Sequence, residues 1–118
     1  MKYALLIYDI EDAAPDEGTP EAMEIYQEYF SFTEDITNEG INEGGEALNR
    51  VDTATTVRVR DGELAVTDGP FAETKEQLGG FYLIDVDDLD QAINAASRIP
   101  AAKTGSIEVR PLWVWDEE

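Results

Sequence analysis

The sequence predicts an α+β domain in which two helices cover one face of an antiparallel sheet and a β-hairpin is inserted between two of the strands. Two observations lead to this fold class. Apolar or alternating segments of strand length outnumber the two segments with helical spacing, and strands flank each helix. The length of 118 residues is that of one compact domain, so we expect residues 1–118 to form a single domain.

The chain begins with a predicted strand and a predicted helix. Residues 2–8 are rich in aliphatic and aromatic side chains, which is typical of a buried strand. A helix is predicted over residues 20–39, because Thr19 can cap its start and Gly40 can end it. Pro20 suits the first helical position, and apolar side chains recur at helical spacing behind it.

A weak strand and a hairpin follow this helix. Residues 41–48 predict a strand in which Gly44–Gly45 indicates a bulge or a close backbone contact. Residues 53–60 alternate between apolar and polar side chains. Asp61–Gly62 is a two-residue turn signal, and the alternation continues over residues 64–66, so these segments predict a β-hairpin.

The last third of the chain predicts a strand, a helix and a strand. Residues 81–86 form the second strongly apolar strand, and Asp87 or Asp88 can cap the helix behind it. One apolar stripe of that helix is predicted from Leu89, Ala92, Ile93 and Ala96. Residues 106–115 predict a final strand, in which Pro111 indicates a sheet edge or a strand end.

Two helices can cover one face of the predicted sheet but not both. The other face would carry large apolar side chains from the central strands and from Trp113 and Trp115, too many for a monomer to leave in water. A two-fold axis buries the same patch on each copy, so we expect the chain to be a homodimer that pairs through this face.

The composition excludes several classes of function. The chain has no His and no Cys, so it lacks imidazole relays, thiolate nucleophiles and the usual zinc ligands, and we expect no cofactor and no metal. The net charge of −19 disfavours nucleic acid and anionic membrane as partners. The acid excess with few lysines suits a salt-adapted, halophilic surface or a solvated face that resists aggregation. Because no spanning-length apolar run or leader segment is recognisable, we expect a soluble, cytoplasmic protein.

A specific resemblance appears in the segment that follows the hairpin. The motif Asp68-Gly69-Pro70-Phe71 and the downstream Gly79–Gly80, together with similar stretches along nearly the whole chain, resemble the DGPF-type branch of the YCII-related proteins. The resemblance implies a ferredoxin-like βαββαβ fold that forms a dimeric α/β barrel. YciI-like relatives have a proposed His/Asp pair in a cleft, which a chain without His cannot carry. Family members are often associated with sigma factor genes.

The loop that contains this motif, hereafter the DGPF loop, is the candidate ligand-binding site. Its candidate residues are Asp68, Gly69, Pro70, Phe71, Glu73 and Lys75. In a functional interpretation, Phe71 roofs a pocket, Lys75 attracts an anionic or carbonyl group and a carboxylate moves a proton. In a structural interpretation, Asp68 caps a turn, Phe71 lies in the core and the charged side chains form an exposed surface.

Three functions remain open from the sequence. The leading hypothesis is a small homodimer that binds an organic small molecule in a cleft between the sheet and the DGPF loop. The alternatives are a histidine-free acid/base enzyme (isomerase, lyase or monooxygenase-like) of the dimeric α/β barrel class, and a regulatory or protein-interaction module. Burial of Asp68 or Glu73 beside Lys75 would favour the enzyme, whereas full exposure of both carboxylates would argue against it.

Overall fold

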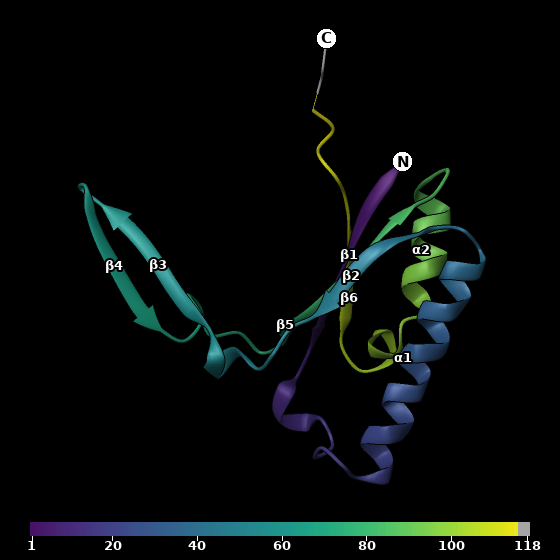
Figure 1. Cartoon of the computed structure of the whole chain (residues 1–118), viewed down its shortest axis with the longest axis horizontal. Helices are drawn as coiled ribbons and strands as arrows, with labels where there is room; N and C mark the ends of the chain where they lie inside the picture. Colours follow the sequence, from purple (N-terminus) through teal and green to yellow (C-terminus); the bar gives the residue numbers. More distant parts are fainter. Residues whose placement is uncertain (116–118) are drawn as a thin grey trace.

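The computed structural model describes residues 1–115, and its main sheet has four antiparallel strands in the order β2-β5-β1-β6. Both helices lie on one face of this sheet, and β3 and β4 form a separate hairpin (Figure 1). This arrangement is a ferredoxin-like α+β fold with an inserted hairpin, so the predicted fold class is confirmed. The strands are β1 (Lys2–Asp9), β2 (Asn42–Ala47), β3 (Thr55–Arg60), β4 (Glu63–Asp68), β5 (Gln77–Asp85) and β6 (Ser106–Pro111). The helices are α1 (Pro20–Asn38) and α2 (Leu89–Ser97), with short 3-10 helices η1 (Glu11–Ala13), η2 (Val51–Thr53) and η3 (Pro100–Lys103).

Both helices begin and end at residues that satisfy their free backbone groups. The Thr19 hydroxyl accepts a hydrogen bond of 3.2 Å from the Ala22 backbone at the start of α1, and the Asp88 carboxylate accepts one of 2.9 Å from Gln91 at the start of α2. After α1, Gly40 takes a positive φ of 80°, which glycine adopts without a Cβ clash. Within the described residues, no helix is long and apolar enough to cross a membrane.

The hydrophobic core lies between the helices and the facing side of the main sheet. Phe32 of α1 and Tyr82 of β5 meet edge to face, with ring centroids 5.0 Å apart. The largest fully buried side chains are Leu5, Ile36, Ile84 and Ile99. These contacts join α1, β1, β5 and the segment after α2 into one cluster.

The buried face of α2 differs from the predicted stripe. Ala92 and Ala96 are buried as expected, and Ala95 is buried with them, but Leu89 and Ile93 are about half exposed. Small alanine side chains let the helix axis approach the sheet closely, which moves the larger side chains to the margin of the contact. The predicted helical spacing is therefore confirmed, and the predicted burial of Leu89 and Ile93 was wrong.

Within residues 1–115, no helix packs on the second face of the main sheet, opposite α1 and α2. Side chains alternate along a strand, so the partners of the buried residues of β1 and β5 point away from the helices. Ala4 lies opposite Leu83 and Leu6 lies opposite Phe81 in the sheet register. All four side chains are apolar and only partly shielded, and we call this set the open face. The expectation of an apolar face that two helices leave uncovered is therefore met.

The hairpin β3–β4, hereafter the arm, extends away from the main sheet (Figure 1). Asp61 and Gly62 at its tip have φ values of 54° and 79°, as a tight two-residue hairpin turn requires. The radius of gyration is 16.5 Å, whereas a compact chain of this length would have about 13.5 Å. The predicted hairpin is therefore present, and it projects from the rest of the chain.

Two strand boundaries differ from the sequence prediction. β5 begins at Gln77, so the Gly79–Gly80 pair lies inside a strand and not in the loop before it. β6 ends at Pro111. Its neighbour β1 begins at Lys2, and the last backbone hydrogen bond between the two segments runs from the Leu112 amide to the Lys2 carbonyl. Trp113 and Trp115 therefore lie outside the sheet, and β6 is an edge strand as its proline indicated.

Candidate functional site

A cavity of about 560 Å³ lies between α1 and the β2–β5 side of the main sheet. Its volume is in the range of sites that hold small organic molecules. Four side chains of α1 form one wall, β2 and β5 form the floor, and β1 and η3 contribute the remaining groups. The lining residues are Ile7, Asp9, Ile25, Tyr26, Tyr29, Thr33, Asn42, Gly44, Gly45, Glu46, Ala47, Gly79, Gly80, Phe81, Tyr82 and Ala101.

Glycines create the space above the floor of this cavity. Gly45 lies opposite Tyr82 and Ala47 lies opposite Gly80, so these positions share the face that points toward α1. A Cβ atom at Gly45 would lie 2.4 Å from the Phe81 carbonyl oxygen, and one at Gly80 would lie 2.8 Å from that of Glu46. Close approach of the two strands therefore requires glycine at both positions, and without side chains there the volume beneath α1 stays open. The close backbone contact predicted at Gly44–Gly45 is confirmed, and the register also shifts beside it.

Hydroxyl groups and one carboxylate provide the polar contacts of the cavity. The hydroxyls of Thr33 and Tyr82 share a hydrogen bond of 2.7 Å between α1 and β5. The Asp9 carboxylate accepts a hydrogen bond of 2.7 Å from the Thr104 hydroxyl, which fixes its position at the end of β1. A few fixed polar groups among apolar and aromatic walls are what orient a small ligand.

Tyr29 projects from α1 into the same space and is partly buried. Burial raises the pKa of its phenol from 10.0 to about 12, and a hydrogen bond from the Ala101 backbone opposes this rise in part. The phenol is therefore fully protonated at neutral pH and can donate a hydrogen bond to a ligand oxygen. It is not a base at that pH.

The raised pKa of Tyr29 predicts how stability changes at alkaline pH. The folded state holds the phenol proton more tightly than the unfolded state, so this contribution is complete below pH 10.0 and is lost as the pH rises toward about 12. We expect the Tyr29→Phe variant to lose less stability than the wild type between these two pH values. Urea unfolding at both pH values measures the difference, with Tyr26→Phe, an exposed tyrosine of the same helix, as the control. An equal loss in wild type and Tyr29→Phe would contradict the burial of this phenol.

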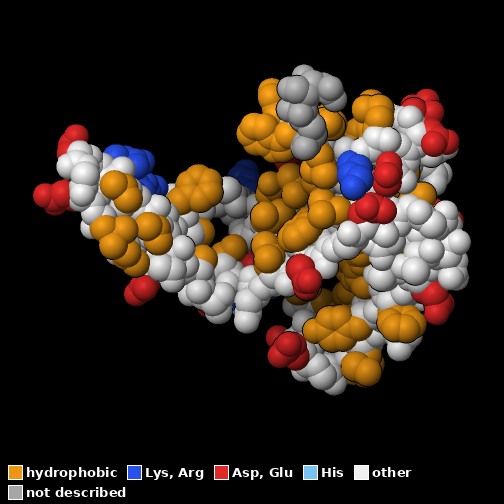
Figure 2. All heavy atoms as spheres, turned by 45° about the horizontal axis from the view of Figure 1, so that its top comes forward, with side chains coloured by type: hydrophobic (Ala, Val, Ile, Leu, Met, Phe, Trp, Pro, Cys, Tyr) orange, Lys and Arg blue, Asp and Glu red, His pale blue; other side chains and the backbone are white. Residues whose placement is uncertain are grey.

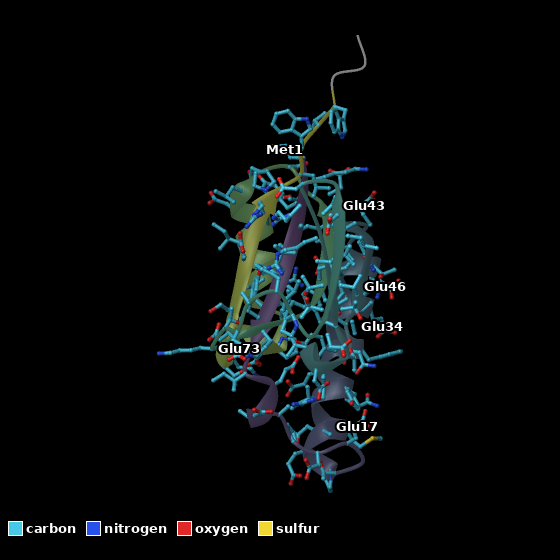
Figure 3. The ribbon with its side chains drawn as sticks, turned by 90° about the vertical axis from the view of Figure 1, so that its left-hand side faces the viewer. Met1, Glu17, Glu34, Glu43, Glu46 and Glu73 are labelled. Atoms are coloured by element: carbon cyan, nitrogen blue, oxygen red, sulfur yellow. The ribbon has the colours of Figure 1, made fainter. Side chains whose placement is uncertain are left out.

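The charges around the cavity have one sign. Asp9 supplies the carboxylate on the α1 side, the Glu46 side chain points to the other face of β2, and none of the described lining residues is Lys or Arg. Figure 3 shows Glu43 and Glu46 along the β2 side of the molecule, on the opposite side from Glu73. A negative rim around aromatic walls repels anions and favours neutral or positively charged molecules.

The six residues predicted at the DGPF loop do not line this cavity in the described chain. Asp68 ends β4, and the Gly69 amide donates to the Ala54 carbonyl at 2.7 Å. Phe71 is 79% exposed, so it neither joins the core nor roofs a pocket within this chain. The structure does not bring Asp68, Glu73 and Lys75 together as an ion pair, and their side chains, like that of Pro70, are exposed. The loop nevertheless leads within a few residues into the Gly79–Gly80 floor.

The sequence analysis missed the residues of α1 and β5 that shape the cavity. No motif of the sequence marks Tyr29, Thr33 or Tyr82 as site residues. A signal was present: Tyr26, Tyr29 and Thr33 place three hydroxyl groups at helical spacing on a stripe that would otherwise be apolar. Buried hydroxyls need hydrogen-bond partners, so such a stripe indicates a polar or solvent-filled contact.

The fold and the cavity define a class of small α+β proteins with two helices on one side of a four-stranded sheet and a glycine-floored pocket between them. The chain belongs to the YCII-related domain family, whose family model matches residues 1–116. It is also 40% identical over 114 residues to "Uncharacterized protein R00369" of Rhizobium meliloti (strain 1021), which covers 95% of this chain and 92% of that protein. The predicted family is therefore confirmed.

Proposed function

We propose that this chain is a binding protein for a small organic molecule that carries no negative charge. The observation that carries the proposal is the cavity of about 560 Å³ beneath α1, with its glycine floor and aromatic walls. Cavities of this size bury most of the surface of a small ligand. Hydroxyl groups would orient the ligand through hydrogen bonds. They belong to the hydrogen-bonded pair Thr33 and Tyr82 and to the protonated phenol of Tyr29.

The charge of the ligand follows from the lining. Tyr26, Tyr29 and Tyr82 supply aromatic rings, and Asp9 supplies negative charge. Aromatic faces and carboxylates together attract ammonium groups, and a net charge of −19 adds to that attraction at long range. An anionic ligand would enter against this field without a cation to receive it. The proposed ligand is thus neutral or an amine with an apolar body.

Two further parts of the proposal concern the assembly and the DGPF loop. A second copy of the chain would cover the open face, since a pair of helices shields only the other side of the sheet. The loop from Asp68 to Lys75 would form the outer rim of the ligand site, because it runs directly into the glycine floor of β5. Location in the cytoplasm belongs to the same proposal.

Three probes of similar size test the charge of the ligand: benzylamine, benzyl alcohol and benzoate. We expect benzylamine and benzyl alcohol to shift the backbone amide signals of Ala47, Gly79 and Gly80 in nitrogen-proton NMR spectra. Benzoate is expected to bind at least about tenfold more weakly than benzylamine, because a charge of the wrong sign in a partly buried site costs at least that much. Tighter binding of benzoate would reverse the assignment of charge.

A matched pair of variants tests the location of the site. Ala47 lines the cavity floor, so Ala47→Leu fills part of the volume and is expected to remove binding of the probes. Ala65 is an exposed residue of the arm, so Ala65→Leu makes the same change outside the cavity and is expected to leave binding intact. Retained binding in Ala47→Leu, or no amide shift with any probe in the wild type, would overturn the proposed site.

A further inference from the structure

The main sheet has two edge strands, β2 and β6, and within residues 1–115 no strand pairs with the outer side of either. β6 ends in Pro111, which has no backbone N–H to donate and therefore discourages a further strand. β2 contains neither proline nor lysine, and Gly44 and Gly45 have no side chains that would keep another strand away. The outer side of β2, hereafter the free edge, is therefore open to a further strand.

The register of β2 shows which backbone groups point to the free edge. The Leu48 amide donates to the Gly79 carbonyl at 2.9 Å, so Leu48 directs its backbone groups toward β5. In an antiparallel pair, residues that bond to the neighbouring strand alternate with residues that face away from it. Gly45 and Ala47 therefore direct their amide and carbonyl groups away from β5. Within the described residues, no backbone hydrogen bond from another segment reaches these groups.

The cavity beneath α1 runs alongside the free edge, because Gly45 and Ala47 both line it. A strand added to β2 would place the residues opposite these two with their side chains on the same face, toward α1. Tyr26 of α1 lines the cavity, and Met23 and Phe30 lie one turn before and one turn after it on the same side of the helix. Tyr26, Met23 and Phe30 are 54%, 55% and 66% exposed. Every second side chain of the added strand would thus face the apolar side of α1.

Acidic side chains accompany the free edge. Figure 3 shows Glu17, Glu34, Glu43 and Glu46 on the side of the molecule that carries α1 and β2. Of these four, only Glu43 forms an ion pair within residues 1–115, with the Lys2 ammonium 3.4 Å from its carboxylate. The face drawn in Figure 2 also shows acidic side chains beside exposed apolar ones on the body of the molecule. Such an edge repels another copy of this acidic chain and attracts a positively charged segment.

We propose that β2 binds an extended, lysine-bearing segment of another protein as a fifth strand of the main sheet, with one lysine side chain inserted beneath α1. Strand addition gives affinity through main-chain hydrogen bonds and specificity through pockets for alternate side chains. A lysine side chain is an ammonium group on an apolar stem, which suits the aromatic walls and the Asp9 carboxylate of the cavity. The inference rests on the proposed function for the charge of the group in the cavity, and it adds the polypeptide that carries this group.

The probe is a short peptide that alternates lysine and threonine and is blocked at both ends, so that all its lysines share one face of a strand. Residues that face α1 in the added strand also direct their amide groups to β2. Methylation of the lysine amide nitrogens is therefore expected to weaken binding at least about tenfold. Methylation of the threonine amide nitrogens keeps the same charge and is expected to change the dissociation constant by about twofold or less. Isothermal titration calorimetry measures all three peptides.

A pair of charge reversals tests the location on the chain. Glu34→Lys alters an exposed acid of α1 on the side of the free edge, and Glu63→Lys makes the same change on the arm, outside the main sheet. We expect Glu34→Lys to weaken the unmethylated peptide by about fivefold. Glu63→Lys is expected to change binding by about twofold or less at about 0.15 M salt, because screening limits the range of its charge. An equal loss in both variants would show that net charge alone attracts the peptide, which overturns the site.

Competition with benzylamine separates this inference from the proposed function. A lysine side chain and benzylamine exclude each other from the cavity, so benzylamine at about ten times its dissociation constant is expected to weaken the peptide about tenfold. Benzylamine binding without peptide binding overturns the inference and leaves the proposed function intact. Peptide binding that benzylamine leaves unchanged overturns the inserted lysine, and equal binding of the two methylated peptides overturns the added strand. Failure of both ligands to bind overturns the inference and the proposed function together.

Discussion

Replacement of Leu83 by glutamate is expected to convert the proposed homodimer into a monomer at micromolar concentration. Leu83 lies on the open face opposite Ala4, at the centre of the main sheet. A carboxylate placed there would be buried without a partner in each of the two copies. Breaking a buried charge pair costs about 3 kcal/mol or more, and an unpaired carboxylate carries a similar penalty. Two such penalties raise the dissociation constant by at least about 1,000-fold.

The matched control for this variant is Leu89→Glu. Leu89 is about half exposed at the start of α2, on the side of the sheet that carries the helices. The substitution adds the same charge and removes the same side chain, so the two variants differ only in the face that they alter. Size-exclusion chromatography with light scattering measures both masses, and far-ultraviolet circular dichroism confirms that the helices persist. A dimer that survives Leu83→Glu as well as it survives Leu89→Glu would exclude pairing through the open face.

The elements with local signals could be predicted from the sequence. Thr19 and Asp88 begin the helices because their side chains accept hydrogen bonds from backbone N–H groups that have no partner within the helix. Asp61–Gly62 ends the alternation of β3 and starts that of β4, because both residues can adopt a positive φ. The layer argument needs only the number of helices, so the uncovered sheet face was predictable as well.

Features that depend on pairing across the sheet could not be predicted. The Gly44–Gly45 pair indicated a close backbone approach, but only the register of β2 with β5 places Gly45 and Gly80 in one floor beneath α1. The end of β6 at Pro111 likewise depends on where β1 begins, which the sequence of residues 106–115 does not contain. A strand needs a neighbour, and the neighbour is distant in sequence.

The candidate site shows the same limit. The DGPF loop stood out as a motif, whereas the cavity is built from common residues at five separate places in the chain. Tyr29 and Tyr82 become notable only because α1 crosses above β5 at that point. Local patterns can indicate that a helix has one polar stretch in an apolar stripe, but the partner that completes the pocket comes from the topology.

The hydrogen bond from Thr104 that holds Asp9 beside the cavity depends on Gly105, a residue outside the cavity. Gly105 precedes β6 and lies against the last residues of β1, where a Cβ atom would be 2.0 Å from the Tyr8 carbonyl oxygen and 2.9 Å from the Asp9 Cα. Both neighbours are backbone atoms, so no side chain can rotate away to make room. Any larger residue at this position must push β6 and β1 apart.

Gly105→Ala is therefore expected to lower the free energy of unfolding by about 3 kcal/mol, which is at the upper end for an overpacked site. The matched control is Gly79→Ala, where the nearest heavy atom, the Ile7 carbonyl oxygen, lies 4.0 Å from the added Cβ. Alanine costs less backbone entropy than glycine in a strand, so Gly79→Ala should be neutral or slightly stabilising. Urea denaturation of both variants measures the change in the free energy of unfolding, which is expected to be a clear loss for Gly105→Ala and no loss for Gly79→Ala. Equal stability of the two would mean that β6 does not approach β1 as closely as described, and the position of Asp9 at the cavity would lose its support.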